Sequence, residues 1–150
     1  MLKVARRRLP TTRFVRGDAL DLPCSDRSFE RVFTGHFYGH LQKPERERFL
    51  AEARRVAPEL VVVDAAVRPD QPRVVPRQAR ILSDGSHWEV YKRYFSGAEL
   101  AAELGGGDIL YEGRWFLVVT SFAVIGGARG PACPSGQVSR RPVRNRSAST

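Results

Sequence analysis

Apolar and polar residues follow two different periods along the first 125 positions of this chain. Between Pro44 and Pro58 the apolar residues recur at helical spacing, which predicts an amphipathic helix with a proline near each end. Residues 60–63, Leu-Val-Val-Val, form an unbroken apolar run that is typical of a strand covered on both faces. Elements of these two kinds alternate, and this alternation predicts an α/β fold with a mostly parallel sheet.

The remaining elements are shorter and are assigned from local pattern and turn residues. Strands are predicted at residues 13–17, 29–34, 109–112 and 115–125, and helices at 1–9 and 96–104. A linker is predicted over 66–77, a short helix around 77–82 and an extended segment over 88–95. Ser96 and Glu99 have the spacing of a capping box, and the last two strands should pair antiparallel across Gly113.

The net charge of +9 changes this picture little once it is mapped along the chain. Residues 1–16 and 126–150 contain basic residues and no acidic ones, whereas residues 17–125 contain slightly more acids than bases. The excess therefore lies at the two ends, and it does not predict a basic groove across a folded face. Nucleic acid is accordingly not an expected partner.

Length and composition indicate one domain without a membrane span. A chain of 150 residues with 42% hydrophobic residues suits a single globular domain, and no apolar run approaches the length of a bilayer. The N-terminus is basic but has no apolar signal core. The two cysteines, Cys24 and Cys133, lie far apart, which argues against a disulfide framework and predicts a cytoplasmic location. Residues 126–150 have no periodicity and predict a disordered basic tail, which leaves residues 1–125 as the domain.

The segment at residues 14–23, Phe-Val-Arg-Gly-Asp-Ala-Leu-Asp-Leu-Pro, is followed at 28–32 by Ser-Phe-Glu-Arg-Val. This pattern resembles the middle of class I S-adenosylmethionine-dependent methyltransferases, and the resemblance extends over about residues 1–125. It implies a partial Rossmann-like sheet that retains strands 3 to 7 of the family order, helices on both faces and a closing antiparallel hairpin. It also implies S-adenosylmethionine as the cofactor.

The resemblance places the cofactor-binding residues at two strand ends. An acidic residue just past the carboxyl end of a strand lies where open α/β sheets bind ligands. In the family, the residue that matches Asp18 accepts from the adenine amine, and the backbone at Ala19 meets a ring nitrogen; Leu20 belongs to the same turn. Thr34 and Gly35 would lie beside the methionine part of the cofactor. The alternative for Asp18 is that its carboxylate only caps a turn.

The next loop carries the candidate catalytic and substrate-binding residues. His36 or His40 could serve as a base, although a base helps only if the methyl acceptor must lose a proton. Phe37 and Tyr38 are expected to face the substrate. The alternative for each histidine is an oriented polar loop residue, and a metal site is not expected because no third ligand is apparent.

The chain also departs from the family pattern. Members begin with a strand, a glycine-rich turn and a helix, and residues 1–150 contain no match for these elements. In the family sheet order, 3-2-1-4-5-7-6, the strands that match 13–17 and 29–34 are separated by strands 2 and 1. We therefore expect unpaired strand edges, or a direct pairing of these two strands.

Three functions remain open at this point. The first is a methyltransferase fragment that acts on an unidentified acceptor, expected to be a small molecule. The second is an inactive remnant, or a subunit whose sheet is completed by a protein partner. The third, a basic nucleic-acid-binding protein, is disfavoured by the charge of the central region.

Overall fold

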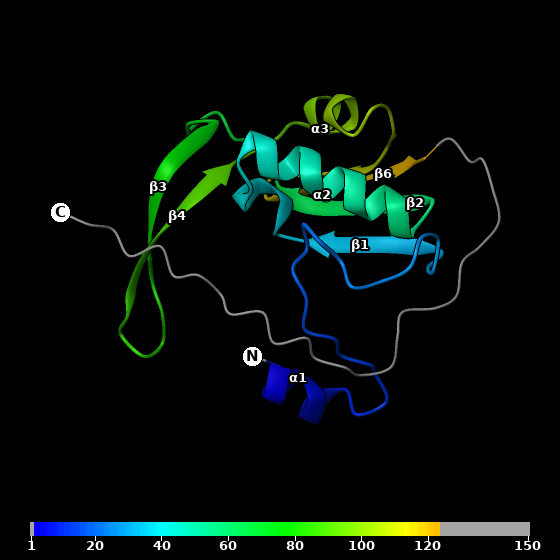
Figure 1. Cartoon of the computed structure of the whole chain (residues 1–150). Helices are drawn as coiled ribbons and strands as arrows, with labels where there is room; N and C mark the ends of the chain where they lie inside the picture. Colours follow the sequence, from blue (N-terminus) through cyan, green and yellow to red (C-terminus); the bar gives the residue numbers. More distant parts are fainter. Residues whose placement is uncertain (1, 124–150) are drawn as a thin grey trace.

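A mixed four-stranded sheet lies at the centre of the molecule (Figure 1). The structure is a computed structural model that describes residues 2–123. The strands lie in the spatial order β1 (Arg31–Gly35), β2 (Glu59–Ala65), β6 (Phe116–Phe122) and β5 (Asp108–Glu112). β1 runs parallel to β2, and β6 is antiparallel to both β2 and β5. This order is the 4-5-7-6 part of the family sheet, so the predicted α/β fold is confirmed. The expectation of a mostly parallel sheet is wrong for the described residues, because only the β1–β2 pairing of the central sheet is parallel.

Two capped helices connect and cover these strands. α2 (Lys43–Val56) begins after Gln42, whose backbone N–H donates to Glu45, and it ends just before Pro58 as predicted. α3 (Gly97–Glu103) has both hydrogen bonds of the capping box between Ser96 and Glu99. Such bonds satisfy the backbone N–H groups that a helix leaves free at its first turn.

Both helices pack on the same face of the sheet. One core cluster joins residues of β2 and β6 to residues of the two helices, including Leu60, Val62, Leu117, Val119, Phe49, Ala53, Leu100 and Leu104. The expectation of helices on both faces is therefore not met within residues 2–123. The apolar run in β2 suggested helices on both faces of the sheet. β2 is apolar on both faces because it lies between β1 and β6, which bury much of its surface.

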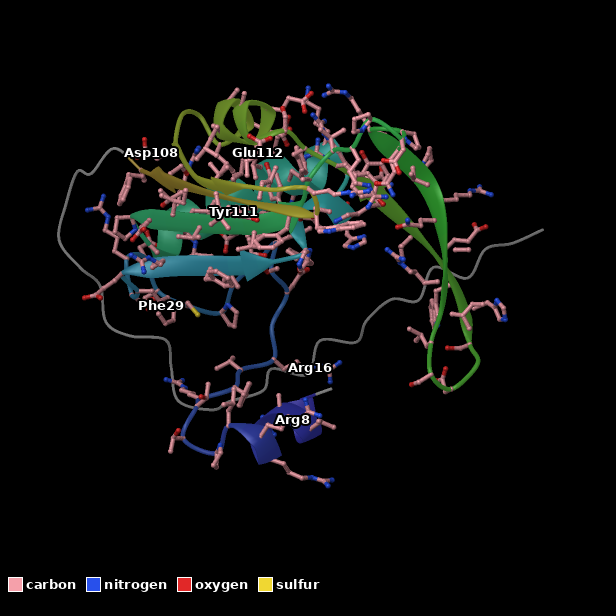
Figure 2. All side chains as sticks on the ribbon, turned by 180° about the vertical axis from the view of Figure 1, so that it is seen from behind. Arg8, Arg16, Phe29, Asp108, Tyr111 and Glu112 are labelled. Carbon is pink, nitrogen blue, oxygen red and sulfur yellow. The ribbon has the colours of Figure 1, made fainter. Side chains whose placement is uncertain are left out.

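The opposite face of the sheet carries exposed aromatic residues. Phe33 of β1 is 66% exposed and Phe122 of β6 is 63% exposed. Tyr111 of β5 stacks on Phe116 of β6 with ring centroids 4.8 Å apart, and both rings remain partly open to solvent. Figure 2 views the molecule from this side and shows the sheet with α2 and α3 behind it. Among the described residues, no helix packs on this open face.

A β-hairpin projects from one end of the sheet. β3 (Val74–Ile81) pairs antiparallel with β4 (His87–Arg93) around a turn in which Gly85 has φ of +80°. The extended segment over 88–95 is confirmed, but the linker over 66–77 and the short helix around 77–82 are wrong over β3. Pro76 weakened the strand pattern, and a register shift between Val75 and Gln78 accommodates it in the hairpin.

The N-terminal segment confirms one prediction and contradicts another. α1 (Leu2–Arg8) is the helix expected over residues 1–9, and it stands apart from the sheet in Figure 1. Residues 13–17 form no strand, and Figure 2 shows Arg16 between α1 and β1. A strand needs a hydrogen-bonding neighbour, and these residues do not pair with β1.

Two further expectations concern the ends and the cysteines. The predicted tail, 126–150, lies outside the described residues. The expectation against a disulfide framework depends on Cys133 as well as Cys24, and Cys133 also lies outside the described residues. None of the helices within residues 2–123 is long and apolar enough to cross a membrane.

Candidate cofactor and acceptor site

The parallel strands β1 and β2 end side by side, and the chain turns sharply after β1. The backbone N–H of His36 donates to Val63 O at 2.8 Å, which extends the pairing by one step. His36 then adopts φ of +53°, a left-handed conformation that costs a residue with a side chain about 1–2 kcal/mol. Strained backbone of this kind is concentrated at functional sites.

Asp18 lies in a tight turn whose carboxylate is exposed. Its Oδ1 accepts a hydrogen bond from the backbone N–H of Leu20 at 2.9 Å, and its carbonyl accepts from Asp21 N at 3.2 Å. Ala19 and Leu20 are partly buried against the core cluster, which fixes the turn to the body of the molecule. The turn-capping alternative for Asp18 is thus present in the structure, and it engages one of the two carboxylate oxygens.

The loop that follows this turn is tied to α2 by Arg55. The guanidinium donates to Leu22 O at 3.0 Å, to Cys24 O at 2.7 Å and to Asp26 Oδ1 at 2.8 Å. Glu52, also on α2, accepts from Leu22 N at 2.8 Å. The hydrogen bond from Arg55 is the main cause that holds the pKa of Glu52 below its ordinary value. The sequence does not reveal this anchor, because Arg55 resembles any basic residue in a last helical turn.

Thr34 and Gly35 end β1 in different environments. Thr34 is buried on the helix-covered face, beside Val62 of β2. Gly35 is exposed, and a Cβ atom added there would meet only a ring carbon of Phe33 at 3.7 Å. The backbone at the end of β1 is therefore open to the approach of a ligand.

The two candidate bases differ in how they are held. His36 is exposed, whereas His40 is partly buried and its Nδ1 lies 2.8 Å from the carbonyl oxygen of Tyr91 in β4. A carbonyl oxygen can only accept, so Nδ1 carries the proton in this contact. In the neutral imidazole the free electron pair then lies on Nε2, which is the nitrogen able to take a proton.

Phe37 and Tyr38 both pack against neighbouring aromatic side chains, and Phe37 is partly buried whereas Tyr38 is completely buried. Phe37 packs edge-on against Phe49 of α2, with ring centroids 5.6 Å apart. Tyr38 begins the short 3-10 helix η1 (Tyr38–His40) and is completely buried. Its hydroxyl donates to Glu103 Oε1 at 3.0 Å, and burial, with the Glu103 carboxylate next, raises its pKa above the ordinary value. The environment of Tyr38 is that of a core residue with a satisfied hydroxyl.

A fully buried ion pair lies directly behind this loop, and the sequence pattern does not predict it. Lys92 of β4 donates to Asp64 Oδ1 of β2 at 2.5 Å, and both side chains are almost wholly inaccessible. Asp64 Oδ2 accepts from Gly39 N at 2.7 Å. The available signal was an aspartate at the end of an apolar strand, but its partner lies in the hairpin that the sequence did not predict.

A cavity of about 310 Å³ lies between the start of α2 and the end of α3. Its lining residues are Tyr38, Lys43, Arg46, Glu47, Leu50, Arg93 and Glu103. None of the predicted cofactor residues lines it. Arg46 is buried there and donates to both Glu103 and Leu41 O, so its charge is already matched inside the protein.

The structure thus gathers the predicted residues into two groups. Thr34 and Gly35 lie at the end of β1, and the η1 turn with His40 follows directly. Asp18, Ala19 and Leu20 lie in a separate turn that packs on the same core cluster. No group of three or more potential metal ligands occurs within the described part of the chain.

Comparison with known proteins agrees with this arrangement. Residues 1–59 match the family model described as a methyltransferase domain. This stretch contains the Asp18 turn, β1, the η1 loop and α2. No curated protein matches the chain in sequence.

Solved structures extend the similarity over most of the chain. The complex of DhpI with SAH is 28% identical, with a TM-score of 0.62, and the match covers 80% of this chain and 59% of that one. The DhpI-SAM-HEP complex gives 24% identity and a TM-score of 0.62, over 79% of this chain and 61% of that one. A 1,6-didemethyltoxoflavin-N1-methyltransferase from Burkholderia thailandensis shares the fold at 17% identity and a TM-score of 0.53, over 79% of this chain and 54% of that one.

These findings define a protein with the Rossmann-like fold of class I S-adenosylmethionine-dependent methyltransferases. The resemblance deduced from residues 14–23 and 28–32 is confirmed by the family match and by the sheet order. The chain spans about three-fifths of the length of the two DhpI structures.

Proposed function

We propose that this chain carries the adenine-binding and acceptor-side half of an S-adenosylmethionine-dependent methyltransferase. The observation that supports the proposal most strongly is the exposed, anchored carboxylate of Asp18 within the segment that matches the methyltransferase family. Two of the similar structures are complexes of DhpI with SAM or SAH, which supports the same cofactor here.

The described residues fit one end of this cofactor. Asp18 has an oxygen beyond the one used in its turn, and a carboxylate oxygen can accept from the adenine amine. The backbone N–H of Ala19, the next residue, would donate to a ring nitrogen of the adenine. Gly35 leaves open space at the end of β1, where a side chain would otherwise oppose the methionine part of the ligand.

The bound cofactor would supply a methyl group on a positively charged sulfur. Methyl transfer is an in-line displacement, so the protein contributes mainly alignment. Where the acceptor must lose a proton, His40 is the better placed base, because its ring is oriented by Tyr91 and its Nε2 can accept. His36, which is exposed and on a strained backbone, remains the second candidate, and Phe37 the candidate contact to the acceptor.

The acceptor is proposed to be a small molecule. The B. thailandensis structure contains 1,6-didemethyltoxoflavin with S-adenosylhomocysteine, which shows that this fold accommodates such an acceptor in that protein. The atom that would be methylated here, oxygen, nitrogen or carbon, is not proposed.

A second function is favoured by the edge of the sheet. β1 is hydrogen-bonded only to β2 among the described strands, which leaves its other edge unpaired. A polypeptide that pairs with this edge would complete the sheet, and cofactor binding would then require that partner. Size-exclusion chromatography combined with cofactor titration tests this function, because a monomeric chain that binds cofactor by itself would contradict it.

The test of the first proposal is calorimetric titration of the purified chain with S-adenosylmethionine. We expect saturable one-to-one binding, and we expect Asp18→Asn to lower the affinity by about tenfold or more, since a charge-assisted hydrogen bond contributes about 1.5–3 kcal/mol. The asparagine retains an oxygen for Leu20 N, so the turn itself should persist.

Asp21→Asn is the matched control, because it removes the same charge three positions further along the exposed turn. Equal losses in the two variants would indicate a general charge effect. Unchanged affinity in Asp18→Asn would contradict the proposed adenine contact.

A further inference from the structure

Three elements that are distant in sequence meet at the carboxylate of Asp64. Its Oδ1 accepts from Lys92 Nζ at 2.5 Å and from Ala65 N at 2.7 Å, and its Oδ2 accepts from Gly39 N at 2.7 Å. The side chains of Asp64 and Lys92 are 0% and 4% exposed. One carboxylate therefore joins β2, β4 and the η1 turn in the interior.

The η1 turn is seated closely against this ion pair. A Cβ atom at Gly39 would lie 2.5 Å from Arg93 O and 2.9 Å from both Asp64 Oδ1 and Lys92 Nζ. Real Cβ atoms do not approach backbone oxygens so closely. Only glycine at position 39 therefore lets η1 pack this closely against β4. The pair and the glycine together determine where the next residue, His40, is placed.

His40 makes the second contact between η1 and β4. Its Nδ1 donates to the carbonyl of Tyr91, the residue that immediately precedes Lys92. Consecutive residues of β4 therefore hold consecutive residues of η1, one through the ion pair and one through the imidazole. If Gly39 moved away from Asp64, His40 would move away from Tyr91.

A buried ion pair has a desolvation cost that packing alone does not require. Two charges removed from water lose hydration, and well-packed apolar side chains of similar volume often stabilise a protein equally well or better. A buried carboxylate differs from an apolar side chain because its hydrogen bonds are directional, and here they orient donors from three elements at once. The desolvation cost of the Asp64–Lys92 pair is explained if the site requires η1 to be held in one orientation.

We propose that Asp64 and Lys92 are positioning residues that hold His40 in the Nδ1–H tautomer, with Nε2 as its proton-accepting nitrogen. The inference rests on the proposed methyl transfer for its purpose, because only an acceptor that loses a proton needs a base. Its structural content does not depend on turnover. It can therefore be tested on the chain itself, whatever the outcome for the proposed function.

The experiment is a long-range ¹H–¹⁵N correlation spectrum of the imidazole rings in the full chain, recorded where histidine is neutral. The chain has three histidines, and the exposed His36 and His87 serve as internal references. We expect His40 alone to show a predominantly protonated Nδ1 and an unprotonated Nε2. A His40 spectrum with protonated Nε2 would overturn the inference.

Two double variants separate orientation from stability. Asp64→Leu with Lys92→Met removes both charges together, so that no unpaired charge is buried, and we expect loss of the Nδ1–H tautomer of His40. Asp64→Asn with Lys92→Met keeps an oxygen for Gly39 N, and we expect the tautomer to persist. Arg31→Met with Glu59→Gln removes a surface ion pair elsewhere on the sheet and should leave all three histidines unchanged.

Gly39→Ala provides an independent variant in which both charges remain. The added methyl group displaces η1 from the pair, and we expect the same loss of the His40 tautomer. If Asp64→Leu with Lys92→Met does not fold, Gly39→Ala and the variant Asp64→Asn with Lys92→Met test whether the contact at Gly39 holds His40 in its tautomer. An unchanged His40 spectrum in Gly39→Ala, with dispersed signals that show a folded chain, would overturn the proposal.

Discussion

Arg55 shows how one side chain can position a binding loop that it does not itself belong to. It joins α2 to three acceptors in residues 22–26, directly after the Asp18 turn. Its pKa lies above the ordinary value, with the Glu52 hydrogen bond as the main cause, so it stays charged throughout the accessible pH range. The exposed carboxylate of Asp18 depends on such anchoring, because residues 13–17 before it belong to no strand.

Arg55→Met should therefore weaken both the fold and the cofactor site. We expect a loss of about 1–3 kcal/mol in the free energy of unfolding, from the hydrogen bonds to a charged group that disappear. Urea denaturation followed by circular dichroism measures this loss. Arg48→Met, an exposed arginine on the same helix, is the control and should change stability little. Equal effects of the two substitutions would show that the loop is held in another way.

At the scale of single residues, the sequence identified acceptors and donors better than it identified their partners. Asp18 and His40 are predicted site residues because a motif surrounds them, and these roles remain predictions. Asp64 and Lys92 were not predicted, because the pair joins positions 28 apart through a hairpin that the pattern did not predict. Tyr38 was expected at the substrate, and its hydroxyl instead lies in the core against Glu103.

At the scale of elements, caps and prolines were the most reliable signals. The boundaries of α2 and α3 follow from local hydrogen bonds that the sequence pattern predicts, such as the capping box of Ser96 and Glu99. The β3–β4 hairpin was missed because strand pairing is a long-range interaction, and Pro76 within β3 conceals its pattern. Residues 13–17 had a strand-like pattern, but a pattern alone does not supply a neighbouring strand.

The capping box of α3 gives a pH-dependent prediction. Hydrogen bonds to Glu99, above all from Ser96 N, hold its pKa below the ordinary value. The charged form is therefore favoured in the folded state, and its contribution is complete above the unfolded pKa and lost as the pH falls through the folded pKa.

Glu99→Gln should lower the free energy of unfolding by about 0.5 kcal/mol at neutral pH, the usual contribution of a charge at a helix N-terminus. The difference from the parent chain should shrink as the pH falls through the folded-state pKa of Glu99, where the carboxylate becomes protonated. Urea denaturation at neutral and at acidic pH measures it, with Glu89→Gln on the exposed hairpin as control. A difference that stays constant with pH would contradict this account of α3.

At the scale of the whole molecule, helices cover only one face of the sheet within residues 2–123. Leu117 lies wholly within the core beneath the helices, whereas Phe33 lies 66% exposed on the open face. The composition could not reveal this asymmetry, since both residues are large and apolar and lie in strands. The sheet order 4-5-7-6, by contrast, was implied by the family resemblance and is confirmed.

Paired truncations test this asymmetry. Leu117→Ala should lower the free energy of unfolding by about 2–5 kcal/mol, because it leaves a cavity in a packed core. Phe33→Ala should cost far less, since little of its ring is buried in the chain alone. Thermal denaturation of both variants measures the contrast. A comparable loss in Phe33→Ala would show that another surface covers the open face in solution.

The central claim is that this chain binds S-adenosylmethionine at the Asp18 turn and the end of β1. Titration of the ¹⁵N-labelled chain with the cofactor, followed by amide chemical shifts, tests it most directly. We expect the signals of Ala19, Leu20 and Gly35 to move and to saturate together, while those of Phe122 and Tyr111 on the open face stay in place. A folded chain whose signals do not move with millimolar cofactor, or move only outside these two segments, would contradict the claim.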